Sequence, residues 1–264
     1  MRKLSHSSMS CWRRCKYKYF LKYIENYVLP SSMGQIRGSI GHSALAVWYK
    51  TGDKDEALHA ANDKLFEYEM ELNRGLDDVW ELMKFILNRY FEWSIENDKF
   101  ELIEAELKFE FKIDKHVFLG YIDGVVEIDG IIWLLEHKFL KQVSMKHVSI
   151  DPQISMYMLA MRKLEFNPRG TFFNVIRMTK GGIAKTEPVV RVKAFRNQEG
   201  LVAIERELVN QANEMTKFHR DGGEMYRNST RDCTWDCNFY PVCLSINDSG
   251  EAKSVLKTFE KRLK

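Results

Sequence analysis

The sequence predicts an α/β fold in which a mixed sheet follows a helical N-terminal region. Residues 1–100 show the apolar periodicity of helices, whereas residues 101–139 show the alternation and short apolar runs of strands. A helix, two strands and a long helix are expected between residues 152 and 219. The order of helices, three strands, helix, strand, strand and helix is typical of an α/β core with a helical insertion before it.

Composition and charge place few limits on function. The chain of 264 residues is 45% hydrophobic and 29% charged, as in soluble globular proteins, and its net charge of +3 identifies no partner. No run of about 18 apolar residues occurs, so we expect no membrane span. The N-terminal charges are followed by no apolar stretch, so we expect no secretory signal.

The helical region is expected to contain a basic arm and amphipathic helices. Residues 6–27 are predicted to form one helix, capped by a serine of SHSS. The segment 30–41 contains glycine, serine and proline and is expected to be a loop, with a helix at 42–49. Longer helices are predicted at 54–72 and 77–98, and the second has a wide apolar face.

The remaining elements divide the chain into three regions. Strands are predicted at 101–112, 117–128, 131–139, 170–177 and 185–192, and helices at 152–164, 196–219 and 250–263. Residues 1–100 therefore hold the basic arm and helical region, residues 101–195 the sheet core, and residues 196–264 a helix and a cysteine-containing tail. We expect these regions to form one compact structural unit.

The stretch GYIDGVVEIDGIIWLLEHKF predicts a hairpin that brings two carboxylates together. Asp129 and Gly130 separate two apolar runs, and Asp-Gly is favoured in type I′ turns because both central residues have positive φ. Counting outward from this turn pairs Asp123 with Glu136 across the ladder, with Cβ atoms about 5 Å apart. Lys138 shares the face of Glu136, because side chains two apart on a strand point the same way.

These like charges need a partner if they are buried. The strand IIWLL is almost wholly apolar, as in strands covered on both faces. Burying two carboxylates unpaired costs several kcal/mol, and a divalent cation between them would remove that conflict. In the alternative interpretation Asp123 is solvated, and Glu136 and Lys138 form a surface ion pair. The hairpin alone leaves both interpretations equally open.

All five cysteines lie near the two ends of the chain, as Cys11, Cys15, Cys233, Cys237 and Cys243. The number is odd and the clusters are tight, which in an intracellular protein favours metal ligation over disulfides. The three late cysteines fall within eleven residues. They are one thiolate short of a four-ligand site.

The residues of the hairpin resemble the central motif of the PD-(D/E)XK nuclease superfamily. Gly120-x-x-Asp123 lies on one predicted strand, and Glu136-x-Lys138 lies on the next. The resemblance implies a restriction-endonuclease-like mixed sheet core, here residues 101–195, and a metal-dependent deoxyribonuclease.

Further motifs are similar to the RecB-type branch of this superfamily. That branch includes the AddB nuclease domain, the CRISPR-adaptation exonucleases and many phage-encoded exonucleases. Gly38-x-x-x-His42 precedes the hairpin and Gln153-x-x-x-Tyr157 follows it, with cysteines on both sides. The motifs span residues 4–243 in the order that the branch implies.

The resemblance implies a role for each motif residue. His42, Asp123 and Glu136 match metal ligands, together with the backbone carbonyl of His137. Lys138 matches a catalytic lysine beside the attacking water and the scissile phosphate. The residues that line the site and contact the substrate strand are matched by Gln153 and Tyr157. An acidic residue that is often found on the first core strand is matched, loosely, by Glu106.

Physical chemistry supports these roles. Phosphodiester hydrolysis needs a nucleophilic water and stabilised phosphate charge, and a divalent ion supplies both. Carboxylates suit Mg²⁺ or Mn²⁺, and the imidazole of His42 favours Mn²⁺. A lysine such as Lys138 stabilises phosphoryl charge. The alternatives are a core histidine at position 42 and, for Gln153 and Tyr157, a packing pair one helical turn apart.

The RecB-type branch also implies a cluster held by one cysteine before the core and three after it. Cys15 is then expected to join Cys233, Cys237 and Cys243 in ligating a [4Fe–4S] cluster, with zinc as the alternative because four thiolates hold either. Cys11 falls where no ligand is expected. The gap between Cys233 and Cys237 is one residue wider than the commoner spacing. The expected role of the cluster is structural, because it would fix the two chain ends beside the core.

The basic arm predicts a nucleic-acid partner. Between Met1 and Val28 the chain has seven Lys or Arg, a single acid and six interleaved aromatic residues. Basic side chains neutralise phosphates, and aromatic rings stack on unpaired bases. In the alternative interpretation the arm packs its aromatic side chains inward and leaves a solvated basic face.

The predicted function is that of a divalent-metal-dependent DNA exonuclease, acting on single strands or duplex ends. The alternative is a non-cleaving nucleic-acid-binding module with a structural iron–sulfur or zinc site. The resemblance implies a cytoplasmic protein of a bacterium, an archaeon or a phage-infected cell. It leaves open an oligomer of the chain, or a partner protein of recombination or CRISPR adaptation.

Overall fold

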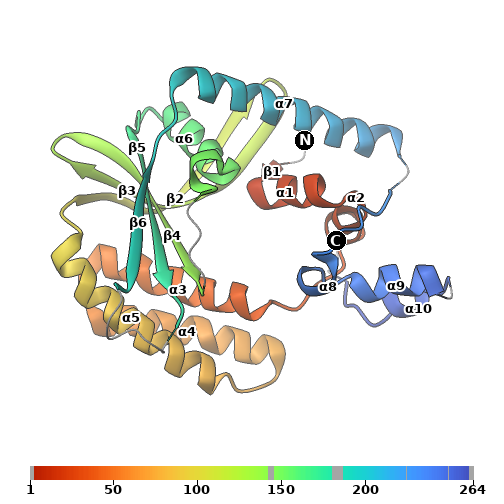
Figure 1. Ribbon diagram of the computed structural model, residues 1–264, viewed down its shortest axis with the longest axis horizontal. Helices are drawn as coiled ribbons and strands as arrows, with labels where there is room; N and C mark the ends of the chain where they lie inside the picture. The colour runs from red at the N-terminus through yellow and green to blue at the C-terminus, as the bar shows by residue number, and fades with distance from the viewer. Residues whose placement is uncertain (1–2, 142–145, 180–186, 224, 249, 262–264) are drawn as a thin grey trace. The chain divides into compact units, whose positions relative to one another are not determined.

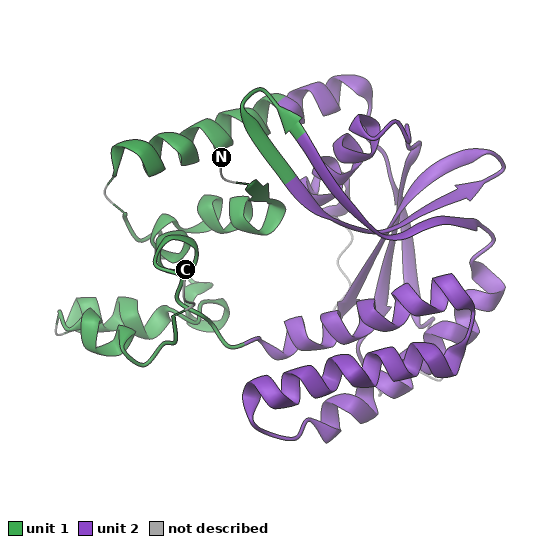
Figure 2. Ribbon diagram, turned by 180° about the vertical axis from the view of Figure 1, so that it is seen from behind, with its two compact units in different colours: residues 1–30, 112–118, 206–264 green, residues 31–111, 119–205 purple. Residues whose placement is uncertain are grey.

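The computed structural model describes residues 3–141, 146–179, 187–223, 225–248 and 250–261. They divide into two compact units that are each assembled from separate segments (Figure 2). The smaller unit comprises residues 1–30, 112–118 and 206–264, and the larger unit comprises residues 31–111 and 119–205. The predicted division of the chain at residues 100 and 195 stays a prediction, because each compact unit combines segments from distant parts of the sequence.

The sheet has six strands, which are β1 (Lys3–Ser5), β2 (Glu101–Ile113), β3 (His116–Ile128), β4 (Ile131–Leu140), β5 (Gly170–Arg177) and β6 (Val189–Ala194). Their order is β1-β3-β4-β5-β6, and β2 pairs with β3. The β3–β4 and β5–β6 pairs are antiparallel, whereas β4 and β5 are parallel. The predicted mixed α/β fold is therefore confirmed.

The predicted hairpin is confirmed with its register. Asp129 and Gly130 have φ values of 52° and 74°, as a type I′ turn requires. The strands pair from Ile128 with Ile131 to Gly124 with Leu135. The next position along this register holds the two predicted carboxylates, Asp123 and Glu136.

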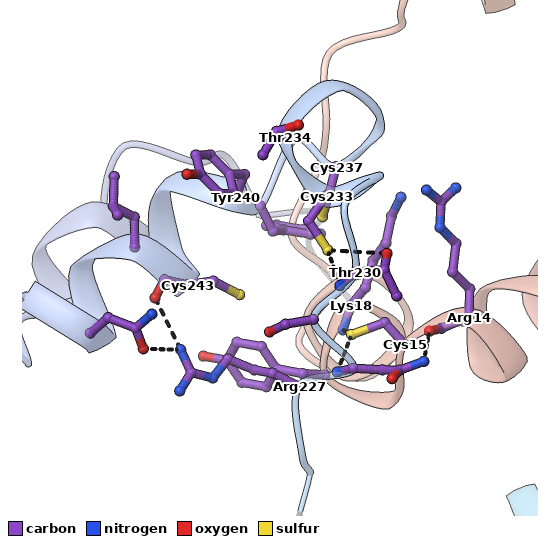
Figure 3. Close-up of a pocket in the computed structure, with 16 residues that line it drawn as sticks. Arg14, Cys15, Lys18, Arg227, Thr230, Cys233, Thr234, Cys237, Tyr240 and Cys243 are labelled. Atoms are coloured by element: carbon purple, nitrogen blue, oxygen red, sulfur yellow. Dashed lines mark hydrogen bonds between the residues drawn. The ribbon is translucent and has the colours of Figure 1, made fainter.

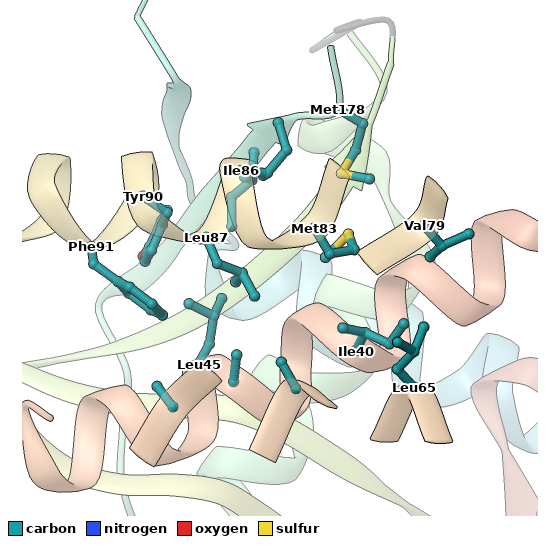
Figure 4. Close-up of a cluster of buried hydrophobic side chains, with 14 of the residues drawn as sticks. Ile40, Leu45, Leu65, Val79, Met83, Ile86, Leu87, Tyr90, Phe91 and Met178 are labelled. Carbon is teal, nitrogen blue, oxygen red and sulfur yellow. The ribbon is translucent and has the colours of Figure 1, made fainter. Parts of the chain in front are cut away.

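One face of the sheet is covered by three helices of the larger unit (Figure 1). They are α3 (Met33–Thr51), α4 (Lys54–Leu72) and α5 (Asp77–Asn97). Their apolar faces meet Ile176, Met178 and Val189 from β5, its end and β6, in the buried cluster of Figure 4. Helix α6 (Pro152–Lys163) lies on the opposite face.

Helix α3 begins earlier than the sequence predicts, so the expected loop at 30–41 is wrong for most of its length. Ser32 and Gln35 form a reciprocal capping box that starts the helix. Ile36 and Ile40 are fully buried against the neighbouring helices. Capping and burial outweigh the low helical propensity of the glycines in this segment.

In the smaller unit, the expected continuous helix at 6–27 is wrong at Cys15. Helix α1 (His6–Arg14) is capped by Ser5, which confirms the serine cap, and α2 (Lys16–Tyr19) continues as a π-helix at Phe20–Ile24. Cys15 is extended, with φ −159° and ψ 114°, and its thiol accepts the N–H of Lys18 as the cap of α2. The break frees the thiol from the helix surface.

Apart from residues 112–118, the rest of this unit comes from the C-terminal part of the chain. Helix α7 (Gln198–Asp221) leads into it, followed by the short helices α8 (Cys233–Asp236), α9 (Tyr240–Asp248) and α10 (Ala252–Leu256). The predicted helix at 250–263 is therefore confined to α10 among the residues described there. A membrane-crossing helix is not found anywhere in the described part of the chain.

Candidate active site

Asp123 on β3 is the centre of a group of polar side chains in the larger unit. Its Oδ1 lies 3.3 Å from Nδ1 of His42, and its Oδ2 accepts the backbone N–H of His137 at 2.7 Å. Burial raises the pKa of Asp123, but the His42 side chain outweighs this and holds the pKa at about 2. The carboxylate is therefore ionised and held at both oxygens.

His42 reaches Asp123 because α3 passes close to β4. A Cβ atom on Gly41 would lie 2.1 Å from the ring of Phe139, so glycine permits this approach. The same ring stands edge-on to the imidazole of His42, with centroids 5.7 Å apart. Burial lowers the pKa of His42, but the charge and hydrogen bond of Asp123 raise it by a larger amount. The pKa of His42 therefore lies above its usual value.

Glu106 on β2 joins His42 and Asp123. Ligand atoms of the three residues all lie within 4.8 Å of one another, the spacing of a metal-binding group. Glu106 has a φ of 55°, a left-handed conformation that is rare for a side chain inside a strand. Such strained backbone is concentrated at functional sites. Burial and the nearby Asp123 raise the pKa of Glu106.

The other predicted site residues form a chain of hydrogen bonds that runs from β4 to α6. The ammonium of Lys138 donates to Oε1 of Glu136 and, at 3.0 Å, to Oε1 of Gln153. Nε2 of Gln153 in turn donates to the hydroxyl of Tyr157 at 2.9 Å. Asp151 caps α6 and holds Gln153 in its first turn. The structure thus brings the predicted residues together, while their roles stay predictions.

Glu136 carries the least compensated charge of the site. Its side chain is almost fully buried, and among the described residues its Oε2 has no hydrogen-bond partner. Burial, and then the charge of Asp123, raise the pKa of Glu136 to about 7. An unpartnered buried carboxylate oxygen beside a second carboxylate fits a site for a divalent cation, because hard oxygen ligands satisfy such an ion.

Lys138 and Tyr157 stay protonated at neutral pH for different reasons. Burial lowers the pKa of Lys138, but the carboxylates of Glu136 and Asp123 raise it more, so the net shift is upward. Burial and Glu136 both raise the pKa of Tyr157. The site therefore contains an ammonium and a neutral phenol beside its carboxylates.

The side chain of His137 is a feature that sequence reasoning missed, because only its carbonyl was expected to act. The imidazole is buried on the face of β4 opposite Glu136 and Lys138. It stacks on Tyr49 and stands edge-on to Tyr90. Burial lowers the pKa of His137 to about 3, so the ring is neutral. No short motif in the sequence signals this packing.

A second site lies in the smaller unit, where four of the cysteines line one cavity of about 190 Å³ (Figure 3). They are Cys15, Cys233, Cys237 and Cys243. All five cysteines of the chain are free, and Cys11 does not line the cavity. Burial raises the pKa of the Cys11 thiol to about 11. The four cysteines that line the cavity are those that the resemblance implies as ligands.

Backbone N–H groups point at two of these sulfur atoms. Lys18 and Asn228 donate to Sγ of Cys15 at 3.4 and 3.5 Å, and Thr230 donates to Sγ of Cys233 at 3.4 Å. Such bonds stabilise thiolates and are among the interactions that tune iron–sulfur clusters. The donor set therefore fits a thiolate-ligated metal or cluster.

Two of the six aromatic side chains of the basic arm are packed inward. Trp12 and Tyr19 are buried, with their ring centroids 5.2 Å apart, so stacking of these two rings on bases is ruled out in this structure. The exposed aromatic side chains of this unit come instead from the tail, where Trp235 is 72% and Tyr226 is 57% exposed. Lys16 lies over the rings of both Trp12 and Tyr226.

Comparisons with known proteins agree with the geometry. The family model of the PD-(D/E)XK nuclease superfamily matches residues 3–244. No curated protein matches the chain. A candidate exonuclease from Eubacterium rectale shares the fold, with a TM-score of 0.60 and 11% identity over 89% of this chain and 86% of that chain. The structure of SSO0001 is 12% identical, with a TM-score of 0.37 over 78% and 82% of the two chains.

Proposed function

Because the chain belongs to the PD-(D/E)XK nuclease superfamily, we propose that it is a divalent-metal-dependent DNA exonuclease that acts on single strands or duplex ends. The observation that carries this proposal is the buried, unpartnered Oε2 of Glu136 beside the ionised Asp123. Lys138 lies at the same carboxylate. A purely structural site has no need for this arrangement of charge.

The metal ligands of this proposal are His42, Asp123 and Glu136, with the carbonyl of His137. The geometry adds Glu106, since it groups with His42 and Asp123. Carboxylates with one imidazole suit Mn²⁺ as well as Mg²⁺. When bound, such an ion supplies Lewis acidity toward the phosphate and lowers the pKa of water.

Lys138 is proposed to stabilise charge on the scissile phosphate. An ammonium has three donors, and two of those of Lys138 are used by Glu136 and Gln153. No partner for the third is found among the described residues, and it is proposed to bind a phosphoryl oxygen. Tyr157 accepts from Gln153, so its own hydroxyl proton is available to the substrate strand.

The preference for DNA ends and the RecB-type assignment rest on the resemblance of the ordered motifs. His42 precedes the nuclease motif, Gln153 and Tyr157 follow it, and cysteines flank both, as in that branch. The shared fold with a candidate exonuclease is in keeping with the proposal, although the likeness concerns the fold alone.

The cysteine cavity is proposed to hold a structural [4Fe–4S] cluster. Its ligands are Cys15, Cys233, Cys237 and Cys243. Four thiolates can hold either an iron–sulfur cluster or zinc. The resemblance to the RecB-type branch supports the iron–sulfur cluster.

Cleavage of end-labelled linear DNA, and of unlabelled circular DNA, tests the nuclease. Wild-type protein is incubated with linear single-stranded DNA, linear duplex or circular duplex, in Mn²⁺, Mg²⁺ or chelator. The same assays are run with Glu136→Ala and Lys138→Ala. We expect metal-dependent loss of linear DNA by the wild type only.

Undiminished cutting by both variants would show that the site lies elsewhere. Cutting of closed circles would replace an exonuclease with an endonuclease. Absence of cutting by the wild type, with DNA binding retained, would favour the alternative of a non-cleaving binding module.

A further inference from the structure

Arg191 on β6 is held on every side behind the candidate active site. Its guanidinium forms an ion pair with Asp98, donates to the carbonyl of Asn97 at 3.1 Å, and donates to Oδ1 of Asn174 at 2.7 Å. The ring centroids of Trp93, Phe100 and Phe172 lie 4.8, 5.9 and 5.4 Å from its central carbon. A fork of donors fixed in this way can set the position of several elements at once.

The first line of contacts from Arg191 leads to helix α3. Asp98, which pairs with Arg191, also accepts the hydroxyl of Tyr49 at 2.8 Å. Tyr49 lies seven residues after His42 on α3, which is close to two full turns. The two side chains therefore share one face of the helix, and His42 reaches Oδ1 of Asp123.

The second line of contacts crosses three strands. Arg191, Asn174 and His137 are register partners on β6, β5 and β4. Because Oδ1 of Asn174 accepts from Arg191, its Nδ2 faces Nδ1 of His137, at 3.5 Å. The peptide N–H of His137 then binds Oδ2 of Asp123.

The two lines support each other where they meet. The ring of His137 stacks on that of Tyr49, with centroids 5.5 Å apart and an interplanar angle of 23°. The hydroxyl of Tyr49 also contacts that of Tyr90, which stands edge-on to His137. His137, Asn174 and Tyr90 are all at most 1% exposed. Movement of either line therefore disturbs the other.

We propose that Arg191 is a positioning residue for Asp123, acting through Tyr49 and His42 on one carboxylate oxygen and through Asn174 and His137 on the other. The proposal rests on the proposed function, because it takes Asp123 as a ligand of the divalent ion. Arg191 is placed to touch neither substrate nor ion. Its effect is to hold the two oxygens of Asp123 in the orientation that the site requires.

Lys193 offers a matched control on the same strand. It lies two residues after Arg191, and its ammonium lies over Phe172 and Trp133 at 5.1 Å from each ring. It therefore shares the strand and the cation–π contact with Phe172, but no bond to Asp98 or Asn174 is found for it among the described residues. Lys193→Met therefore removes a cation–π contact with Phe172 from a more exposed position and leaves the bonds of Arg191 intact.

The primary measurement is the dissociation constant for Mn²⁺ alone, by calorimetry on metal-free protein. Loss of groups that orient a ligand weakens metal binding by about tenfold or more, which is the result expected for Arg191→Met. Lys193→Met is expected to bind as the wild type does. Arg191→Lys restores a charge beside Asp98 but not the fork, so it is expected to recover thermal stability without recovering Mn²⁺ affinity.

Two further variants keep the proposal testable if Arg191→Met does not fold. Tyr49→Phe interrupts the first line and keeps the stacked ring, and Asn174→Ala interrupts the second. Each is expected to weaken Mn²⁺ binding, and to lower kcat at limiting Mn²⁺ with little change in KM for DNA.

The proposal would be overturned if three folded variants, Arg191→Lys, Tyr49→Phe and Asn174→Ala, all bound Mn²⁺ with a dissociation constant within about threefold of the wild-type value. A threefold change is well below the loss of affinity expected for groups that orient a ligand. Loss of melting temperature without loss of Mn²⁺ affinity would overturn it in the same way, by showing a structural role only. Wild-type protein that binds Mn²⁺ but cuts no DNA would remove the exonuclease proposal alone. Wild-type protein that binds no Mn²⁺ would overturn both.

Discussion

Lys138 and Glu136 lie two residues apart on β4 and bind each other through the ammonium and Oε1, while the second oxygen of Glu136 has no partner in the described part of the chain. In the metal-free protein, Lys138 therefore binds one oxygen of the Glu136 carboxylate, and the other oxygen is left for the proposed ion. The two side chains are expected to have separable functions, with Glu136 in metal binding and Lys138 in phosphate stabilisation.

Lys138→Met is expected to lower kcat by about 10²–10³-fold, the usual cost of removing one donor that stabilises transition-state charge. Mn²⁺ affinity is expected to be no weaker, because removal of a competing cation leaves Glu136 free to bind the ion. Single-turnover cleavage and calorimetry measure the two effects. Lys163→Met, which removes a surface lysine paired with Glu205, is the control. Loss of Mn²⁺ affinity in Lys138→Met would contradict this division of roles.

The metal-free protein is expected to lose stability as pH rises from 5 to 8 because of Glu136. The pKa of this group is raised from 4.5 to about 7 by burial and by Asp123. The folded state thus holds the proton more tightly than the unfolded chain, so the contribution is full below pH 4.5 and is lost as pH passes 7. The loss is up to roughly 3 kcal/mol.

Thermal unfolding of wild type and Glu136→Gln in chelator isolates this contribution. The lowered pKa of His137 acts in the opposite direction in the same pH range, but it is common to both proteins. The wild type is expected to lose more stability than the variant between pH 5 and 8. Parallel curves would contradict the assignment. Glu101→Gln, an exposed position at the start of β2, is expected to follow the wild type.

Gly41→Ala is expected to destabilise the protein by about 1–3 kcal/mol, the usual cost of overpacking. The new Cβ would lie 2.1 Å from the ring of Phe139, beside His42. Gly38→Ala lies one turn earlier on α3 and meets nothing within 4 Å, so it is expected to be neutral or to gain up to about 1 kcal/mol. Denaturant unfolding compares them. Recovery of stability by Phe139→Leu in the Gly41→Ala background would identify the contact as the cause.

Cys15→Ala is expected to abolish the cluster, whereas Cys11→Ala is expected to retain it. Cys15 lines the cavity with the three late cysteines, and Cys11 does not. Iron and sulfide content and the visible absorption of anaerobically purified protein measure the outcome. Loss of the cluster in Cys11→Ala but not in Cys15→Ala would show that Cys11, and not Cys15, is the ligand. Zinc in place of iron in the wild type would replace the cluster by a zinc site.

The hairpin shows what local sequence can predict. Asp129-Gly130 sets the turn, the turn sets the register, and the register places Asp123 beside Glu136 without any long-range information. The cysteine grouping was also predictable, although from the resemblance of the motifs rather than from spacing.

Other features depend on contacts that no local pattern contains. The break at Cys15 and the early start of α3 arise because burial and capping outweigh intrinsic propensity. The left-handed Glu106 and the contacts of Arg191 with Asp98 and Asn174 join residues from different elements. Their partners are set by the assembled sheet and helices.

The order of residues along the chain bears on biosynthesis. His42, Glu106, Asp123, Glu136 and Arg191 all belong to the unit that ends at residue 205. The cysteine cavity instead needs Cys15 and three cysteines from position 233 onward, so its closure has a far larger sequence separation. Since domains fold as units during N-to-C synthesis, the proposed nuclease centre can assemble on the ribosome before the last cysteines emerge. Insertion of the proposed cluster would then be a late maturation step, separate in time from the folding of the larger unit.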